Sequence, residues 1–332
     1  MNPVGVQGIA FVELAGPRPD QLHDLLIAFG FSRTMRHATR AIDLYEQREM
    51  TFLLDREPTR RGPTINAMGW YAASPQIAID RGAKPAQGLL DLPAIHGIGE
   101  SLIYFVRPGR DGDRRALGFV PHERPVRVPD KGFVAIDHLT NNVYAGTMER
   151  WASFYKDVFG FTEVRYFDIR GVMTGLTSYA LRSPCGTFAI PINEAAESKS
   201  QINEYLDEHG GPGIQHLAFT TDDILASLRA LDGTPIRFLD IDDDYYATVF
   251  DRVPRVTEDR EALRARNVLI DGDDRGYLLQ IFTHNLIGPI FIEIIQRRGH
   301  DSFGEGNFGA LFRSIERDQV KRGYLTQDST RT

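Results

Sequence analysis

An internal repeat is the feature that most constrains the fold of this 332-residue chain. Residues 8–37 read as an apolar strand, a loop, an amphipathic helix, a Gly-Phe step and another extended run, and residues 133–167 follow the same order. Both segments carry Phe-Gly-Phe where the helix ends, so Gly30 and Gly160 are suited to terminate their helices in the left-handed conformation. A shorter copy, in which a strand leads into a helix, begins at residue 214.

The repeated unit is a strand, a helix and then several strands, which differs from a parallel crossover unit. Its second copy places apolar side chains at three- and four-residue spacing over residues 148–158, after Thr147 as a candidate N-cap. Such an apolar stripe needs a sheet to cover it. We therefore predict an α+β fold of two similar halves, each built from paired βαβββ modules that curl into a barrel-like mixed sheet with helices outside.

The boundary between the two halves is expected within residues 121–131. Three prolines and mixed charges interrupt the periodic apolar pattern there, which is typical of a linker. The sequence therefore predicts one domain over residues 1–125 and another over residues 130–332. The first half looks shortened between about residues 56 and 85, where the helix of its second module is hard to find.

Composition and charge argue against several classes of partner. The net charge of -7, with basic residues scattered among acidic ones, argues against nucleic-acid binding. No apolar run approaches the roughly 18 residues of a membrane span, and the N-terminus lacks the pattern of a signal peptide. A single cysteine, Cys185, excludes an intramolecular disulfide and fits a reducing compartment. We expect a cytoplasmic protein without a membrane or nucleic-acid partner.

Three polar residues stand in otherwise apolar strands of the second half. His138 in "AIDHLTN" and His216 in "GIQHLAF" occupy equivalent places in the first strands of the two modules. Glu293 lies in the apolar run "IGPIFIEIIQR". A lone buried carboxylate there would cost several kcal/mol or take up a proton unless a positive group compensates it. Taken singly, each histidine is more often a buried residue with a hydrogen-bond partner.

Taken together, the three residues indicate a metal site. They lie far apart in the sequence, so they meet only if the half curls into a cup, as the repeat suggests. Two imidazoles and one carboxylate are the donor set of the facial triad of non-haem Fe(II), although catalytic zinc sites use the same donors. In the first half Phe11 stands where His138 does and Glu100 aligns roughly with His216, so one metal site per chain is expected.

Five segments of the sequence resemble the 4-hydroxyphenylpyruvate dioxygenase family: "DHLTNNV", "GIQHLAF", "LLQIFT", "FIEIIQR" and "GEGNFGALFRSIERDQ". The resemblance is dense from about residue 132 to the C-terminus and looser before it. It implies a vicinal-oxygen-chelate fold and one Fe(II) per chain, held by His138, His216 and Glu293. It further implies that 4-hydroxyphenylpyruvate and O₂ become homogentisate and CO₂ in tyrosine and phenylalanine catabolism, through oxidative decarboxylation, ring hydroxylation and side-chain migration.

The resemblance also implies the residues around the substrate. Polar substrate-side positions and an aromatic wall are matched by Ser178, Asn193, Gln201, Gln280, Phe282, Asn307, Phe308 and Phe312. Catalytic roles fall on Gln280 and Phe308. The C-terminal helix would act as a lid over the metal, with the glycines of residues 299–306 as its hinge. Gln215 matches a further position near the site, although strict strand alternation turns it away from the metal that His216 faces. Either it supports the ligands from behind or the strand is locally twisted, and it is not counted as a ligand.

Several alternatives remain open from the sequence. A 4-hydroxymandelate synthase shares the fold, triad and substrate but hydroxylates the benzylic carbon; Phe308 and the segment "PINE" follow the dioxygenase pattern instead. A non-catalytic metal-binding protein of the same fold is a second alternative, and a zinc or manganese isomerase a third. Since the resembling family is homo-oligomeric, we expect a homo-oligomer.

Overall fold

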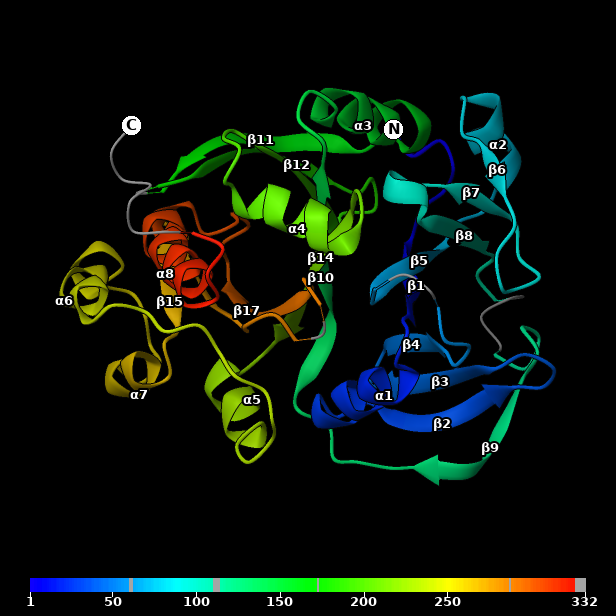
Figure 1. The fold of residues 1–332 in the computed structure, drawn as a ribbon, viewed down its shortest axis with the longest axis horizontal. Helices are drawn as coiled ribbons and strands as arrows, with labels where there is room; N and C mark the ends of the chain where they lie inside the picture. Colours follow the sequence, from blue (N-terminus) through cyan, green and yellow to red (C-terminus); the bar gives the residue numbers. More distant parts are fainter. Residues whose placement is uncertain (60–61, 110–113, 172, 287, 326–332) are drawn as a thin grey trace.

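The chain folds into two curled mixed sheets, one from each half of the sequence, with helices packed outside them (Figure 1). The computed structural model describes residues 1–59, 62–109, 114–171, 173–286 and 288–325. In that part of the chain, no helix has the length and apolar character needed to cross a membrane.

The first sheet has nine strands in the order β6-β7-β8-β5-β1-β4-β3-β2-β9. Its strands are β1 (Gly8–Ala15), β2 (Ser32–His37), β3 (Ile42–Gln47), β4 (Met50–Asp55), β5 (Thr64–Tyr71), β6 (Pro85–Ala86), β7 (Ala94–His96), β8 (Leu102–Val106) and β9 (Phe119–Val126). The helical segments of this half are α1 (Pro19–Ala28), α2 (Pro75–Asp80) and η1 (Ile98–Glu100).

The second sheet has eight strands in the order β11-β12-β13-β10-β14-β17-β16-β15. Its strands are β10 (Phe133–Val143), β11 (Thr162–Arg170), β12 (Gly175–Arg182), β13 (Ala189–Ala195), β14 (Gly213–Thr221), β15 (Leu269–Gly272), β16 (Tyr277–Phe282) and β17 (Phe291–Arg298). The helical segments are α3 (Met148–Phe154), η2 (Tyr155–Phe159), α4 (Gln201–His209), α5 (Ile224–Ala230), α6 (Asp243–Arg252), α7 (Arg260–Ala265), η3 (Glu305–Asn307) and α8 (Phe308–Lys321).

The strand orders of the two sheets confirm the predicted pair of βαβββ modules in each half. Read from β2 to β6, the first sheet runs β2-β3-β4-β1-β5-β8-β7-β6, and every strand has a counterpart at the same place in the second sheet. Thus β1 corresponds to β10, β5 to β14 and β8 to β17. The helix that was hard to find in the sequence is α2, which is only six residues long.

Helix ends follow the local sequence. Gly30 and Gly160 have φ angles of 84° and 80°, in the left-handed region where only glycine is unstrained. Asp223 caps α5, because its side chain accepts a hydrogen bond from the Ala226 N–H. Thr147 precedes α3 but makes no such side-chain bond to the helix; its hydroxyl donates to the Tyr144 carbonyl instead. Thr147 therefore occupies the predicted N-cap position without the predicted bond.

The two halves share one hydrophobic core. Phe219 on β14 packs its ring against Phe31 and Phe52 of the first half, with ring centroids 5.9 and 6.0 Å apart. Trp70 on β5 lies 5.0 Å from Phe159 and 5.3 Å from Phe188 of the second half. Each of these side chains is at most 2% exposed. Because such aromatic contacts bury large apolar areas, each sheet stabilises the other.

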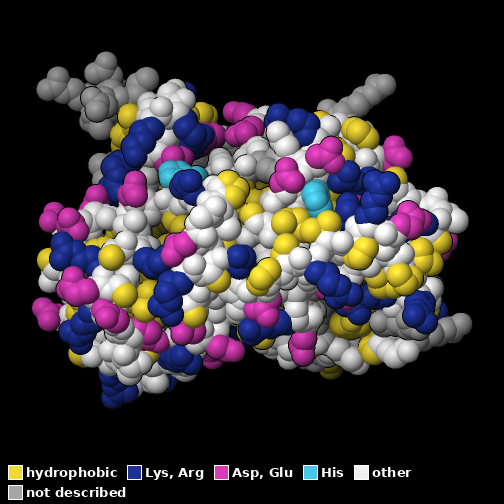
Figure 2. All heavy atoms as spheres, turned by 90° about the horizontal axis from the view of Figure 1, so that it is seen from below, with side chains coloured by type: hydrophobic (Ala, Val, Ile, Leu, Met, Phe, Trp, Pro, Cys, Tyr) yellow, Lys and Arg dark blue, Asp and Glu magenta, His cyan; other side chains and the backbone are white. Residues whose placement is uncertain are grey.

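The chain crosses from one sheet to the other after β9. This strand carries Pro121 and Pro125 and, among the described residues, pairs with β2 alone at the sheet edge. Proline is tolerated there because one side of an edge strand needs no donor. The first sheet thus reaches Val126, and β10 begins at Phe133. On the face that Figure 2 shows, basic and acidic side chains are interspersed over both halves.

Candidate metal centre and cavity

Three neighbouring strands in the middle of the second sheet bring the predicted ligands together. His138 lies on β10, His216 on β14 and Glu293 on β17, and β14 runs between the other two strands. The Nε2 atom of His138 lies 3.1 Å from Glu293 Oε2, and Nε2 of His216 lies 3.7 Å from the same oxygen. One ligand atom from each residue lies within 4.8 Å of the others. The curled sheet thus places residues from distant parts of the sequence around one point.

The spacing and charge of these atoms suit a divalent metal ion. Two ligands bound at right angles about 2.1 Å from one ion lie roughly 3.0 Å apart, close to the shorter distance observed here. Without a metal, burial tends to lower the pKa of His138, but Glu293 and Asp137 outweigh it and raise the pKa to about 9. Burial and the nearby His138 hold the pKa of His216 well below its usual range. Protonated His138 is thus a positive partner for Glu293 in the absence of a metal. A metal ion bound by these residues would provide the same positive charge.

A second pair of charged residues holds the His138 ring from behind. Asp137 Oδ2 lies 2.7 Å from Nδ1 of His138, and Arg297 donates to both Asp137 oxygens at 2.7 and 2.8 Å. Burial alone would raise the pKa of Asp137, but Arg297 and His138 lower it far below its usual range. The ionised Asp137 keeps the proton of the imidazole on Nδ1, so Nε2 faces Glu293 as a metal ligand requires.

Sequence reasoning missed this pair, although two signals were present. Asp137 directly precedes a candidate ligand, and Arg297 follows Glu293 by four residues on an apolar strand. A charged residue at such a position has to find a buried partner.

Gln215 lies beside the other imidazole. Its Oε1 is 3.4 Å from Nδ1 of His216, so the amide helps to orient that ring. Thr140 pairs with His216, whereas the next residue of β10, Asn141, pairs with Ile214, so Gln215 is the extra residue of a β-bulge. The bulge is a local departure from strict alternation, and it lets two successive side chains of β14 face the same cavity.

A cavity of about 670 Å³ opens beside the three candidate ligands. Residues from several strands and α8 line it, and six of them are phenylalanines. Of the residues predicted to contact substrate, the structure places these in its wall: Ser178, Asn193, Gln201, Gln280, Phe282, Phe308 and Phe312. The wall also contains residues that the sequence did not single out, among them Phe167, Phe291, Phe303, Leu311 and Ile315.

Asn307 does not line the cavity. It is fully buried behind Gln280, where its amide donates to Gln280 Oε1 at 3.2 Å. Its own Oδ1 accepts a bond of 2.6 Å from the Tyr245 hydroxyl of α6. Gln280 in turn donates to Glu293 Oε1 at 3.5 Å. Asn307 thus orients Gln280 from behind, because η3 directs its side chain toward α6 instead of toward the cavity.

The helix α8 covers the cavity with one apolar face. Phe308, Leu311, Phe312 and Ile315 all point into the cavity wall. Phe308 packs edge-on against Phe167 of β11, with ring centroids 5.3 Å apart. In Figure 1, α8 lies within the second half; it packs on β11, and its Gln319 donates to Glu204 of α4 at 2.8 Å.

The first half has the same strand rows but no counterpart of the triad among its described residues. His138, Ala218 and Glu293 lie side by side across β10, β14 and β17. The corresponding row of the first sheet is Phe11, Gly69 and Tyr104. The rings of Phe11 and Tyr104 lie 5.7 Å apart and fill the space, and Gly69 is required because a Cβ there would meet the Phe11 ring at 2.3 Å.

One part of the predicted alignment was wrong. Phe11 does correspond to His138, but the counterpart of His216 is Ala67, two residues before Gly69 on β5. Glu100 lies outside the strands, exposed at the end of η1. The error arose because β8 runs parallel to β5 and therefore corresponds to β17, not to β14.

The first half nevertheless buries one carboxyl group. Glu13 on β1 is fully buried; Oε1 accepts a bond of 2.7 Å from the Asn66 amide, and Oε2 has no hydrogen-bond partner among the described residues. Burial raises the pKa of Glu13 to about 7, since the Asn66 bond lowers it only in part and Asp55 raises it further.

Comparison with known proteins gives consistent results for both halves. The model of the hydroxyphenylpyruvate dioxygenase N-terminal family matches residues 1–115, and that of the glyoxalase/bleomycin resistance protein/dioxygenase superfamily matches residues 135–260. The chain is 52% identical to Protein MelA of Shewanella colwelliana, covering 98% of this chain and 99% of MelA. It is 43% identical to a 4-hydroxyphenylpyruvate dioxygenase of Legionella pneumophila, covering 98% of both chains. Among solved structures, a mutant of 4-hydroxymandelate synthase from Streptomyces coelicolor matches 95% of this chain and 99% of its own with a TM-score of 0.80 at 26% identity.

Proposed function

The chain belongs to the 4-hydroxyphenylpyruvate dioxygenase family, and from this premise we propose that its cavity binds one Fe(II) and 4-hydroxyphenylpyruvate. The reaction would consume O₂ and give homogentisate and CO₂, as a step of tyrosine and phenylalanine catabolism. The observation that supports this most directly is the convergence of His138, His216 and Glu293 at a cavity with an aromatic wall.

The donor set and the cavity together fit Fe(II). When bound, Fe(II) would supply three open coordination positions, enough for two oxygens of a 2-oxo acid and for O₂. Among the described residues that line the cavity, none is a lysine or an arginine. The carboxylate of the substrate therefore has no lysine or arginine to bind, and His138 already faces Glu293. A buried anion requires a positive partner. A metal at the triad provides that partner.

The side chains around the triad would bind and orient the substrate. Phe282, Phe308 and Phe312 offer ring faces and edges against which a phenol ring can pack. Ser178, Asn193, Gln201 and Gln280 supply uncharged hydrogen-bonding groups for the phenol end. We assign direct catalytic contacts to Gln280 and Phe308, because Gln280 bonds the ligand Glu293 and Phe308 comes from the covering helix. Asn307 would act through Gln280.

Water exclusion is the role of α8. Its apolar face, from Phe308 to Ile315, lines the cavity and would keep water out on that side. Oxidative chemistry at a metal needs such a dry site, because water and exposed protein groups compete with the substrate. The glycines before α8 would allow the helix to move for substrate entry.

Product identification tests the proposal. Metal-free protein mixed with Fe(II), ascorbate and 4-hydroxyphenylpyruvate should consume O₂ and release homogentisate, whereas the same protein loaded with Zn(II) should not. Hydroxymandelate as the product would identify a 4-hydroxymandelate synthase, a possibility kept open by the fold similarity to that enzyme. Absence of turnover with Fe(II) would favour a non-catalytic metal-binding protein.

We further propose that the enzyme is a cytoplasmic homo-oligomer with one catalytic domain per chain. Residues 130–332 would form that domain, and residues 1–125 a domain without a metal site. The single cysteine suits a reducing compartment. Light scattering coupled to gel filtration would measure the mass of the assembly, and a mass of 37.4 kDa would show a monomer.

A further inference from the structure

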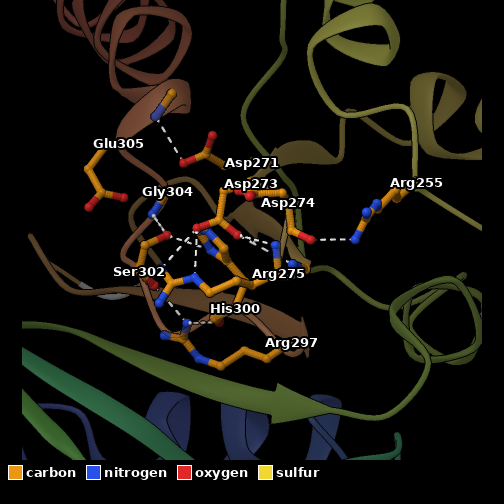
Figure 3. A network of polar contacts seen from close by, with 12 residues as sticks. Arg255, Asp271, Asp273, Asp274, Arg275, Arg297, His300, Ser302, Gly304 and Glu305 are labelled. Atoms are coloured by element: carbon orange, nitrogen blue, oxygen red, sulfur yellow. Dashed lines mark hydrogen bonds and ion pairs between the residues drawn. The ribbon is translucent and has the colours of Figure 1, made fainter.

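The segment between β17 and the covering helix is held by a polar network that the proposed reaction does not use. We call residues 299–307 the hinge segment. Within it, the Ser302 hydroxyl lies 2.7 Å from Nδ1 of His300, and the Gly306 N–H donates to Asp271 at 3.0 Å. Figure 3 shows this network beside Arg297. The segment leads directly into α8, so its order sets where the helix begins.

Arg297 links the hinge segment to the metal centre. Its Nε and Nη2 atoms bond the two carboxylate oxygens of Asp137, which holds Nδ1 of His138. Its remaining nitrogen, Nη1, donates to the backbone carbonyls of His300 at 3.0 Å and Ser302 at 2.6 Å. One planar guanidinium thus binds an outer partner of a metal ligand on one edge and the hinge backbone on the other.

A second contact connects the same groups. The Phe303 ring packs edge-on against the His138 ring, with centroids 5.5 Å apart, and the Arg297 guanidinium lies 6.0 Å from its centre. Phe303 also lines the cavity and packs 6.4 Å from Phe167, which contacts Phe308 on α8. The hinge segment therefore contacts the imidazole of His138 directly as well as through Arg297.

The chemistry of arginine is required at this position. All three nitrogens of the guanidinium are used, in fixed directions within one plane. A lysine ammonium is a single point charge, so it cannot span the carboxylate and both carbonyls at once. The Arg297 side chain is only 18% exposed and that of Asp137 13%, so water does not readily replace these bonds.

We propose that Arg297 is a positioning residue that couples metal binding at His138 to the order of the hinge segment. The proposal rests on the metal site proposed above. A metal that fixes the His138 ring fixes Asp137 and Arg297, and Arg297 then holds the hinge carbonyls in place. Because such coupling is reciprocal, an ordered hinge also strengthens metal binding. The cavity would then close preferentially when a metal ion is bound to His138, His216 and Glu293.

The test combines metal titration with hydrogen exchange. Co(II), whose visible absorption reports ligand binding, is titrated into metal-free wild-type protein and Arg297→Lys. Exchange of the peptide that covers the hinge segment is then measured by mass spectrometry with and without Co(II). In the wild type, Co(II) should slow exchange of this peptide. In Arg297→Lys, Co(II) should bind about 10- to 100-fold more weakly, and at saturation it should no longer slow exchange there.

Arg298→Lys is the matched control. Arg298 is the next residue, is 48% exposed, and pairs with Glu258 outside the network. In this variant Co(II) should bind, and should slow exchange of the hinge peptide, as in the wild type. If an arginine-to-lysine change loosened β17 in general, Arg298→Lys would instead show the same losses as Arg297→Lys. If Arg297→Lys fails to fold, Phe303→Leu measures the same coupling and should reduce the slowing of exchange.

The outcomes separate the two proposals. A wild type that does not bind Co(II) would refute the metal site itself. A wild type that binds Co(II) without slower exchange in the hinge segment would refute the coupling. The coupling would also be refuted if Co(II) slowed exchange of the hinge segment in Arg297→Lys as much as in the wild type. The same holds for Phe303→Leu where that variant replaces Arg297→Lys.

Discussion

Replacing Glu13 by glutamine should stabilise the protein at pH 8 by several times as much as it does at pH 5. The Glu13 carboxyl is fully buried, and burial raises its pKa from 4.5 to about 7. The folded state therefore holds this proton more tightly than the unfolded state does. Between pH 4.5 and 7 the unfolded chain releases the proton while the folded chain keeps it, so the wild type loses stability as the pH rises through this window.

The size of the effect follows from the pKa difference. At about 1.4 kcal/mol per pKa unit, the difference between 4.5 and about 7 corresponds to about 3 kcal/mol of lost stability above pH 7. The glutamine side chain in the Glu13→Gln variant has nearly the same shape as the protonated carboxyl group and carries no charge at any pH. The variant should therefore exceed the wild type by about 3 kcal/mol at pH 8.

Urea unfolding of metal-free protein at pH 5, 6, 7 and 8 measures this difference. Other titrating groups are shared by both proteins and cancel when the two free energies of unfolding are subtracted. Glu49→Gln is the control, because Glu49 is exposed in the turn between β3 and β4 and its substitution should give no comparable trend. A wild-type-minus-variant difference that stays constant from pH 5 to pH 8 would show that Glu13 is not protonated in the folded state.

Three further substitutions test the site and the core. Glu293→Ala should abolish Fe(II) binding in a titration of metal-free protein, and full activity in this variant would refute the ligand assignment. Gly304→Ala should raise KM, because a Cβ at φ 79° would lie 1.8 Å from Gln280 Oε1; Gly323→Ala, with the same φ but open space around it, should leave KM unchanged. Phe219→Ala should lower the free energy of unfolding by about 3–5 kcal/mol, and a loss below about 1 kcal/mol would contradict a core shared by both halves.

The three candidate ligands were within reach of sequence analysis because the repeat supplied an internal alignment. His138 and His216 could be compared as equivalent strand positions, and Glu293 was conspicuous as a carboxylate in an apolar strand. The prediction of the two sheets was confirmed for the same reason, because one βαβββ module describes all four repeats of the chain. Where the alignment rested on a short apolar motif alone, as at Glu100, it assigned the wrong strand.

The remaining features depend on tertiary contacts that spacing does not encode. Gln215 faces the cavity only because a bulge interrupts its strand, and a bulge is set by the register against β10. The partnership of Asp137 with Arg297 joins two strands that are not neighbours in the sheet. Asn307 could be placed near the site by resemblance, but its direction toward Gln280 depends on how η3 packs against α6.

The row of Phe11, Gly69 and Tyr104 can be compared with the equivalent row of His138, Ala218 and Glu293 to see which additional residues a candidate metal centre requires. The two rows occupy equivalent positions in equivalent sheets, yet one is sealed by two rings and the other keeps ionisable groups with an adjacent cavity. The aromatic row needs only packing, whereas His138 needs Asp137 and Arg297 behind it, and His216, two residues before Ala218 on β14, needs Gln215. Building a copy of the candidate metal centre in the first half would therefore require transplanting those supporting residues along with the candidate ligands.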